Sequence, residues 1–293
     1  MGLKQQTRHY LRLVKIRKTT KRDRVNSIVQ SEKMSVKPKT RPKSGAKRFL
    51  TKECHAVGPV GTDVQEFTIY GERSTGTNFT QALLERNFPD LNRISTFPWE
   101  KHSYVATPIA KPSTLAIVVV REPIRWMQSL FRNPHQVGSW SAGLSFSDFI
   151  RHEWSSVFDG WLFPRQRSFG ASGKELMLDR HPLTGARPKN IIELRNWKGQ
   201  SYGRIPAFYQ NWVFLRYEDL NEDPEGFLAE LSETYRLKSN SDIVSKIEDV
   251  SNVASNSTRT NAPYPEVTPD DHKFILKEID DEQERRFGYL TNK

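Results

Sequence analysis

LAIVVVREP, residues 115–123, joins six apolar residues directly to a polar Arg-Glu-Pro segment. A continuous apolar run of this length, rich in β-branched residues, is typical of a strand buried on both faces of a parallel sheet. Pro123 suits the first turn of a helix, so we predict that the strand leads into a helix extending through Arg132. The stretch therefore indicates an α/β fold in which helices cover a parallel sheet.

The same patterns predict alternating elements along the rest of the chain. We expect strands at 67–70, 190–194 and 212–215, and helices at 78–88, 147–154, 224–235 and 269–286. Alternation of this kind is typical of a layered α/β fold. Residues 160–189 are rich in Gly, Pro, Arg and Lys without periodicity, which indicates a long surface insertion of the kind that often carries substrate contacts.

Charge divides the chain into two parts. Of its 293 residues, the first 52 hold seventeen Lys or Arg against two acidic residues, whereas the remainder is slightly acidic although the whole chain carries +11. We therefore predict a disordered basic tail over 1–60 and an α/β domain over 61–293. The tail is either a solvating segment, a contact for nucleic acid, another polyanion or a membrane surface, or an Arg-rich transit peptide.

Cys54 is the single cysteine, which excludes an intrachain disulfide and a cysteine-based zinc cluster. No apolar stretch approaches the ~20 residues needed to span a bilayer, and the N-terminus lacks the apolar middle of a secretory signal. We therefore expect a soluble, cytoplasmic protein without a transmembrane segment.

A first motif with chemical meaning is YGERSTGTNF, residues 70–79, between a predicted strand and a predicted helix. Backbone N–H groups at such a junction, together with the helix N-terminus, can hold a phosphate. Gly71 and Gly76 have the spacing of a Walker A loop, but Thr77-Asn78 replaces its Lys-Ser/Thr pair, which argues against an ATPase or kinase. The alternative is an ordinary strand-to-helix turn with a Ser or Thr cap.

A second motif places Arg121 at the end of the buried strand and Ser129 eight residues later, two helical turns on. Open α/β sheets bind ligands at the carboxyl ends of their strands, where a guanidinium can grip a phosphate bidentately. Without other motifs, the pair could equally be a salt-bridging arginine and an exposed serine.

Taken together, these motifs resemble the family of sulfotransferases that use 3′-phosphoadenosine 5′-phosphosulfate (PAPS), over roughly residues 66–290. The resemblance implies a three-layer, P-loop-like fold, PAPS as donor co-substrate and no metal. Residues 214–220 resemble a recurrent late strand of the family, and 288–290 resemble a common ending. Arg121 with Ser129 resembles the family's 3′-phosphate site. The loop for the 5′-phosphosulfate resembles the stretch Arg73, Ser74, Thr75, Gly76, Thr77, Asn78 and Phe79.

The resemblance also suggests catalytic residues. The family commonly places a histidine base between the two phosphate motifs, where His102 lies, with Glu100 as reserve. The family's loop lysine corresponds to Ser74, so we expect Arg73 or Lys101 to stabilise the leaving phosphate. An isolated histidine is more often structural or exposed. Phe79 corresponds to an aromatic residue that stacks on adenine, although packing in the core is equally compatible with it.

The resemblance implies a hydroxyl or an amine as the acceptor, and the similarity to carbohydrate sulfotransferases favours a saccharide. Basic residues recur in the 160–189 insertion, and 190–195 either position the acceptor or form a structural strand. The main alternative is a non-catalytic nucleotide-binding domain whose basic tail binds nucleic acid or another polyanion. A kinase is a third possibility, which the missing Lys-Ser/Thr pair disfavours.

Overall fold

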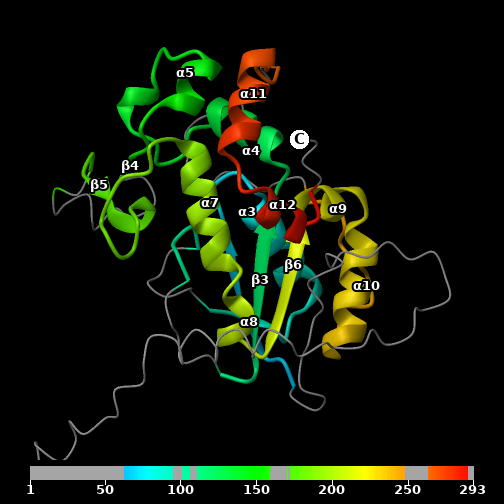
Figure 1. Cartoon of the computed structure of the whole chain (residues 1–293). Helices are drawn as coiled ribbons and strands as arrows, with labels where there is room; N and C mark the ends of the chain where they lie inside the picture. Colours follow the sequence, from blue (N-terminus) through cyan, green and yellow to red (C-terminus); the bar gives the residue numbers. More distant parts are fainter. Residues whose placement is uncertain are drawn as a thin grey trace, which may run out of the picture. The chain divides into compact units, whose positions relative to one another are not determined.

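A computed structural model describes residues 63–94, 101–105, 111–158, 170, 172–247 and 263–289, which all belong to one compact unit. The predicted basic tail and Glu100 lie outside these residues. The unit is built on a four-stranded sheet with the strand order β2-β1-β3-β6, in which every neighbouring pair is parallel (Figure 1). The strands are β1 (Glu66–Gly71), β2 (Asn92–Arg93), β3 (Thr114–Val120) and β6 (Asn211–Arg216).

The central strand β3 confirms the reasoning from its apolar run. All seven of its residues are buried, and it pairs with β1 on one side and β6 on the other. Its side chains alternate between the two faces of the sheet, as strand geometry requires. Leu115, Ile117 and Val119 join one hydrophobic cluster, and Ala116, Val118 and Val120 join another.

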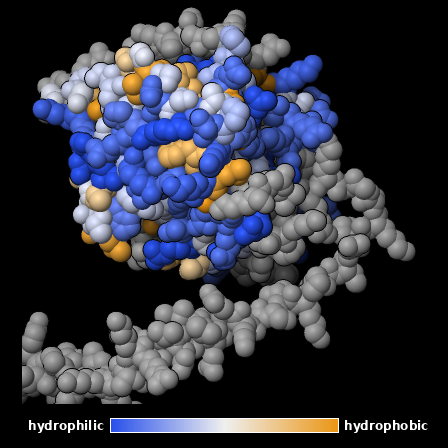
Figure 2. All heavy atoms as spheres, turned by 45° about the horizontal axis from the view of Figure 1, so that its top comes forward, coloured by the Kyte–Doolittle hydropathy of each residue, from blue (hydrophilic) through white to orange (hydrophobic). Residues whose placement is uncertain are grey.

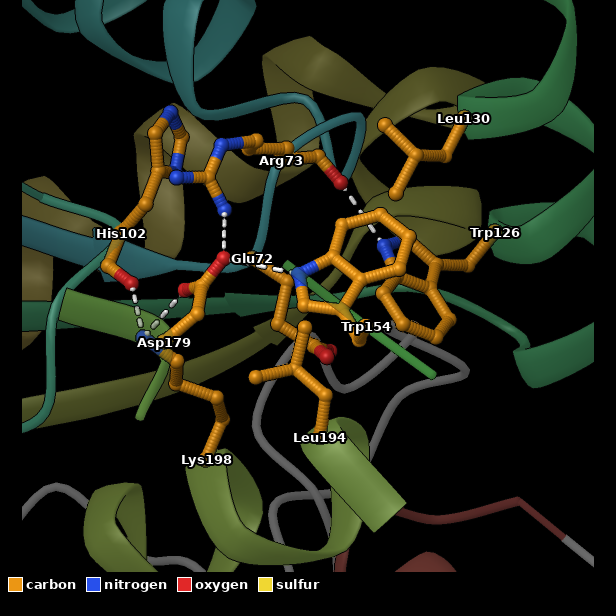
Figure 3. Close-up of a pocket in the computed structure, with 9 residues that line it drawn as sticks. All are labelled: Glu72, Arg73, His102, Trp126, Leu130, Trp154, Asp179, Leu194 and Lys198. Carbon is orange, nitrogen blue, oxygen red and sulfur yellow. Dashed lines mark hydrogen bonds and ion pairs between the residues drawn. The ribbon is translucent and has the colours of Figure 1, made fainter. Parts of the chain in front are cut away.

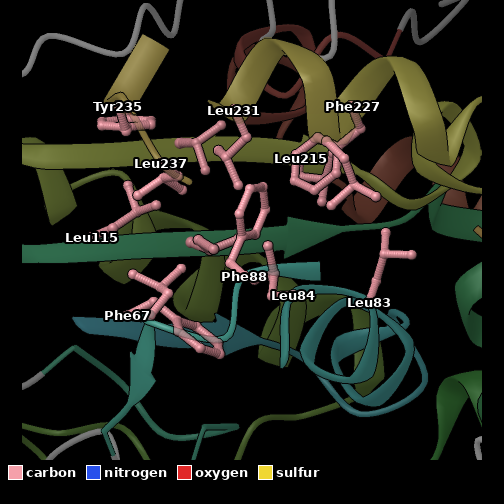
Figure 4. Close-up of a cluster of buried hydrophobic side chains, with 14 of the residues drawn as sticks. Phe67, Leu83, Leu84, Phe88, Leu115, Leu215, Phe227, Leu231, Tyr235 and Leu237 are labelled. Carbon is pink, nitrogen blue, oxygen red and sulfur yellow. The ribbon is translucent and has the colours of Figure 1, made fainter. Parts of the chain in front are cut away.

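Helices cover both faces, so the predicted α/β class is confirmed. On the first face, α3 (Thr77–Asn87) and α10 (Pro224–Tyr235) pack their apolar sides against the sheet (Figure 4). The short helix α9 (Tyr217–Glu222) adds Leu220 to this cluster. On the second face lie the end of α7 (Ile191–Tyr202), α8 (Ile205–Phe208) and the residues after α12 (Asp281–Arg286).

A third hydrophobic cluster lies beyond the carboxyl edge of the sheet. It joins α4 (Pro123–Arg132), α5 (Phe146–Arg151), the first half of α7 and α11 (Pro269–Glu278). The small antiparallel pair of β4 (Ser156–Val157) and β5 (Glu175–Leu176) lies nearby, and two short 3₁₀ helices span Ser139–Ser141 and Met177–Asp179. None of the described helices is long and apolar enough to cross a membrane.

Several predicted elements differ from the structure. The strand expected at 190–194 is wrong: these residues begin α7, because the Asn190 side chain accepts the backbone N–H groups of Ile192 and Glu193 and thereby caps a helix. The helix expected at 269–286 is two helices, since the chain leaves the helical conformation at Ile279 and Asp280 caps a new one. The helix expected at 147–154 is shorter and starts earlier, after the cap Ser145.

The predicted insertion at 160–189 is described only in part. Its described residues include β5 and the 3₁₀ helix that ends at Asp179, so they are not a purely irregular surface loop. Asp179 is 2% exposed and lies in the interior.

Candidate functional site

The carboxyl ends of β1, β3 and β6 lie side by side, and each leads into a polar residue of interest. Residue pairs Gly71–Val119 and Val120–Arg216 are in register, so the loop after β1, Arg121 after β3 and Tyr217 after β6 meet at one edge. Figure 2 tilts forward the top of Figure 1, the side toward which β3 and β6 point, and shows a face of mostly hydrophilic residues with small hydrophobic patches between them. The edge is the place where ligands bind in open α/β sheets.

The loop after β1 leaves the N-terminus of α3 open. Gly76 precedes the helix with a left-handed backbone (φ 96°), and no side chain caps the first turn. The alternative of an ordinary Ser/Thr-capped turn is therefore not what the structure has. The Thr75 hydroxyl instead donates to the Glu72 carbonyl at 2.7 Å and tightens the loop itself. Uncapped N–H groups at a helix N-terminus favour an anion.

Arg121 lies directly on this loop. Its Nη1 donates to the Ser74 carbonyl at 3.0 Å, and its guanidinium lies 4.6 Å from the centre of the Tyr217 ring. Its Nη2 donates to the Tyr264 hydroxyl at 3.2 Å. Its Nε is buried and has no hydrogen-bond partner among the described residues. Arg121 and the loop after β1, which lie about fifty residues apart in the sequence, are thus in contact.

Ser129 lies on α4 and is partly buried. The helix also carries Arg125 and Arg132, whose guanidinium groups lie 5.3 Å and 4.5 Å from the centre of the Tyr264 ring. Ser129 falls between these two arginines on the same helical face, since it is four residues after the first and three before the second. The structure therefore places Ser129 among cationic side chains, while its role with a phosphate stays a prediction.

His102 lies beside the loop because its segment hydrogen-bonds to the end of β1. The Gly71 N–H donates to the Lys101 carbonyl at 3.1 Å, and the His102 Nδ1 lies 2.7 Å from the Gly71 carbonyl. A carbonyl only accepts, so Nδ1 carries the proton and Nε2 carries the lone pair. Burial, followed by the positive charges of Lys101 and Arg73, holds the pKa of His102 well below its usual value. The ring is therefore neutral at neutral pH, and its role as a base stays a prediction.

Lys101 reaches the same helix terminus from the neighbouring residue. Its Nζ donates to the side-chain carbonyl of Asn78, the second residue of α3. A cation is thereby placed beside the loop, which lacks a lysine of its own. Phe79, one residue further on, packs partly buried against the core cluster of the first sheet face. Its stacking on an adenine stays a prediction.

Arg73 turns inward instead of toward the surface. It is 4% exposed, and its Nη1 lies 2.8 Å from Asp179 Oδ2. Its Nε and Nη2 donate to Gln136 Oε1 at 3.0 Å and 2.9 Å. All of these hydrogen-bond partners are side chains of the protein itself. The predicted contact of Arg73 with a donor phosphate is untested and stays a prediction.

Buried charges form two linked groups beneath the loop, which sequence reasoning did not find. In one, Arg195 lies 3.1 Å from Glu72 and 2.6 Å from Glu284. In the other, Asp179 lies between Arg73 and Lys198. Burial is the main reason that the pKa of Glu72 rises to about 7, although Arg195 opposes it. These residues look like ordinary charged positions in the sequence, because their partners are far away along the chain.

A small cavity of about 10 Å³, close to what one water molecule needs, lies at the centre of these groups (Figure 3). Charged and aromatic side chains line it together. They are Glu72, Arg73, His102, Trp126, Leu130, Trp154, Asp179, Leu194 and Lys198. The described residues contain no group of three or more His, Cys, Asp or Glu that could hold a metal ion.

The structure thus brings together the loop, Arg121, Lys101 and His102, which the sequence had proposed from three separate stretches. Comparison with known proteins adds no assignment, since no family model and no curated protein matches the chain.

Proposed function

We propose that this chain is a sulfotransferase with a P-loop-like fold, which moves a sulfuryl group from PAPS to a hydroxyl or amine. The observation that supports it best is the 3.0 Å contact between Arg121, at the end of β3, and the loop that follows β1. PAPS carries anionic groups at two ends of one adenosine. Two anion-binding elements that touch at one sheet edge suit a ligand of that kind.

The side chains at this edge fit an anionic nucleotide in two respects. Arg121 keeps a buried Nε without a partner among the described residues, so it has a donor to offer. The first N–H groups of α3 have no side-chain cap and point to the same loop. In the proposed arrangement the loop amides and Lys101 bind the 5′-phosphosulfate, and Arg121 with Ser129 binds the 3′-phosphate.

The chemistry then needs one base and a stabilised leaving group. His102 Nε2 takes the proton of the acceptor while the acceptor oxygen or nitrogen forms a bond to sulfur. The bond from sulfur to the bridging oxygen breaks, and its electron pair stays on the 5′-phosphate of the departing 3′-phosphoadenosine 5′-phosphate (PAP). Lys101 and the loop amides stabilise that charge, and Lys101 can also donate a proton. Charge stabilisation and in-line positioning supply most of the acceleration in such transfers.

We propose a saccharide as the acceptor, with the 160–189 insertion as the segment that selects it. Of the basic residues described there, Arg180 and Arg187 both bind Glu175 at 2.8 Å, which gives this part of the insertion a fixed shape. A fixed, charged segment next to the base is suited to orienting a polar acceptor.

The test is thermal stabilisation by PAP, compared with ATP and AMP, followed by a transfer assay with PAPS. A ligand present at 100 times its dissociation constant stabilises the native state by about 2.7 kcal/mol. We expect this effect for PAP with the wild type and its loss in Arg121→Ala. Arg93→Ala is the matched control, because Arg93, on β2, forms an exposed ion pair with Glu85 of α3.

Three outcomes would count against the proposal. Equal stabilisation by PAP and AMP would show that no second phosphate site exists. PAP binding without any sulfuryl transfer would favour the alternative, a non-catalytic nucleotide-binding domain. Loss of PAP binding in Arg93→Ala as well would show that the Arg121 effect is not specific.

A further inference from the structure

Lys198 has an unusual position for a lysine. It lies on α7, is 1% exposed, and its Nζ contacts three oxygen atoms from two parts of the chain. It donates to the His102 carbonyl at 2.6 Å and to the Leu178 carbonyl at 2.6 Å, and it lies 3.0 Å from Asp179 Oδ1. One ammonium group therefore joins the segment of the proposed base to the insertion.

Asp179 extends this connection to the loop. Its carboxylate receives Arg73 Nη1 at 2.8 Å and Trp154 Nε1 at 2.9 Å, in addition to the ion pair with Lys198. Figure 3 shows the carboxylate of Asp179 between the ends of Arg73 and Lys198. Burial alone would raise the pKa of Asp179, but Arg73 and Lys198 outweigh it and keep the carboxyl ionised.

Burying three charges is costly, and hydrophobic side chains of similar size often stabilise a fold better. Stability alone is therefore a poor explanation for this cluster of buried charges. Its contacts are also selective. Arg73 belongs to the loop, and Lys198 touches the backbone of His102 itself, whose ring must keep its Nδ1 on Gly71 to leave Nε2 as a base.

We propose that Lys198 and Asp179 form a clamp that positions His102 and the loop for the transfer reaction. The clamp rests on the function proposed above. Arg73 then acts through Asp179 as a positioning residue, and Lys101 is the side-chain cation left to meet the leaving phosphate. A misplacement of about 1 Å by a change outside the reacting groups can cost about 100-fold in rate.

The variants that test the clamp are Lys198→Met, which removes the charge and all three contacts, and Lys198→Arg, which keeps a cation and its donors. Lys277→Met is the matched control, because Lys277 is an exposed lysine on α11, a helix that packs against α7, and it lies outside the 160–189 insertion. Asp179→Asn keeps the size of the side chain and serves if Lys198→Met does not fold. For each variant we would measure kcat, the affinity for PAP and the tautomer of His102 by ¹⁵N NMR of the imidazole.

We expect kcat of Lys198→Met to fall about 100-fold while PAP affinity stays within about threefold of the wild type. The Nδ1–H tautomer of His102 should give way to a mixture, and Lys198→Arg should restore much of both properties. In Asp179→Asn the rate should also fall without a gain in PAP affinity. Lys277→Met should behave as the wild type.

Three results would overturn the clamp. An unchanged kcat together with an unchanged tautomer in Lys198→Met would show that Lys198 positions nothing. Equal losses of kcat in Lys198→Met and Lys277→Met would indicate a general effect of removing a lysine near α7. Tighter PAP binding by Asp179→Asn would show that Asp179 competes with the donor for Arg73. If the wild type neither binds PAP nor transfers sulfate, the proposed function fails, whereas a tautomer change in Lys198→Met would still support the positioning of His102.

Discussion

Replacing Gly76 with Ala should destabilise the protein more than a single methyl group usually does. Gly76 has a φ of 96°, a conformation that costs an L-residue about 1–2 kcal/mol. The new Cβ would also lie 2.2 Å from Cδ2 and 2.7 Å from Cε2 of Tyr217, and overpacking of this kind costs about 1–3 kcal/mol. Moving the ring away would disturb its contact with the guanidinium of Arg121, which lies 4.6 Å from the ring centre. We therefore expect a loss of about 2–5 kcal/mol in the free energy of unfolding.

Urea unfolding followed by circular dichroism measures this loss, and Gly143→Ala is the matched control. Gly143 also has a positive φ, of 78°, but an added Cβ there meets nothing within 4 Å. The control should therefore show only the backbone cost of about 1–2 kcal/mol. Because a displaced Tyr217 ring would disturb Arg121, Gly76→Ala should also weaken stabilisation by PAP, whereas Gly143→Ala should not. Equal losses of stability in the two variants would refute the reasoning from the Tyr217 contact.

Further predictions concern the base and the buried charges. His102→Ala should lower kcat by about 10²–10⁴-fold with PAP affinity nearly intact, since a general base contributes about this much to the rate. A fully active variant would exclude His102 from the mechanism. Arg195→Met should cost about 3–5 kcal/mol in the free energy of unfolding, because it leaves Glu72 and Glu284 buried without their cation. A loss no larger than that of the control Lys277→Met would contradict this. Burial raises the pKa of Glu72 to about 7, so the native state holds this proton more tightly than the unfolded state does. The stability that this proton gives at acid pH is lost as the pH rises through about 7. Urea unfolding between pH 5 and pH 8 should therefore show the wild type losing stability relative to Glu72→Gln as the pH rises, and a constant difference would contradict the shift.

The elements that the sequence predicted well carry signals that are local. Strand β3 follows from six apolar residues in a row, and α10 has the predicted bounds because Asp223 caps it and Pro224 occupies its first turn. The strand predicted at 190–194 failed because a short apolar run fits a strand and a buried helix equally well. Asn190 was the available signal, since an asparagine before such a run is a common helix cap.

The parts of the candidate site that come directly after strand ends were predictable from the sequence. Arg121 and the loop come directly after neighbouring parallel strands, so the sequence placed both at one edge. The buried ion pairs were not predictable, because Arg73 and Asp179 are 106 residues apart and Arg195 and Glu72 are 123 residues apart. No periodicity connects positions at such separations. The sequence marked Arg73 as a candidate phosphate contact, whereas Glu72, Asp179 and Arg195 resemble solvated surface residues there.

The parallel pairing of β3 has a consequence for work with shortened forms of the chain. Its partner β6 begins only at Asn211, so ninety-six positions separate the paired residues Leu115 and Asn211. Contacts between such distant residues form late during folding. Any fragment that ends before Asn211 leaves an apolar strand with one open edge, and such edges recruit further chains. Expression of these fragments should therefore yield insoluble aggregates, and deletion boundaries are better chosen outside 66–216.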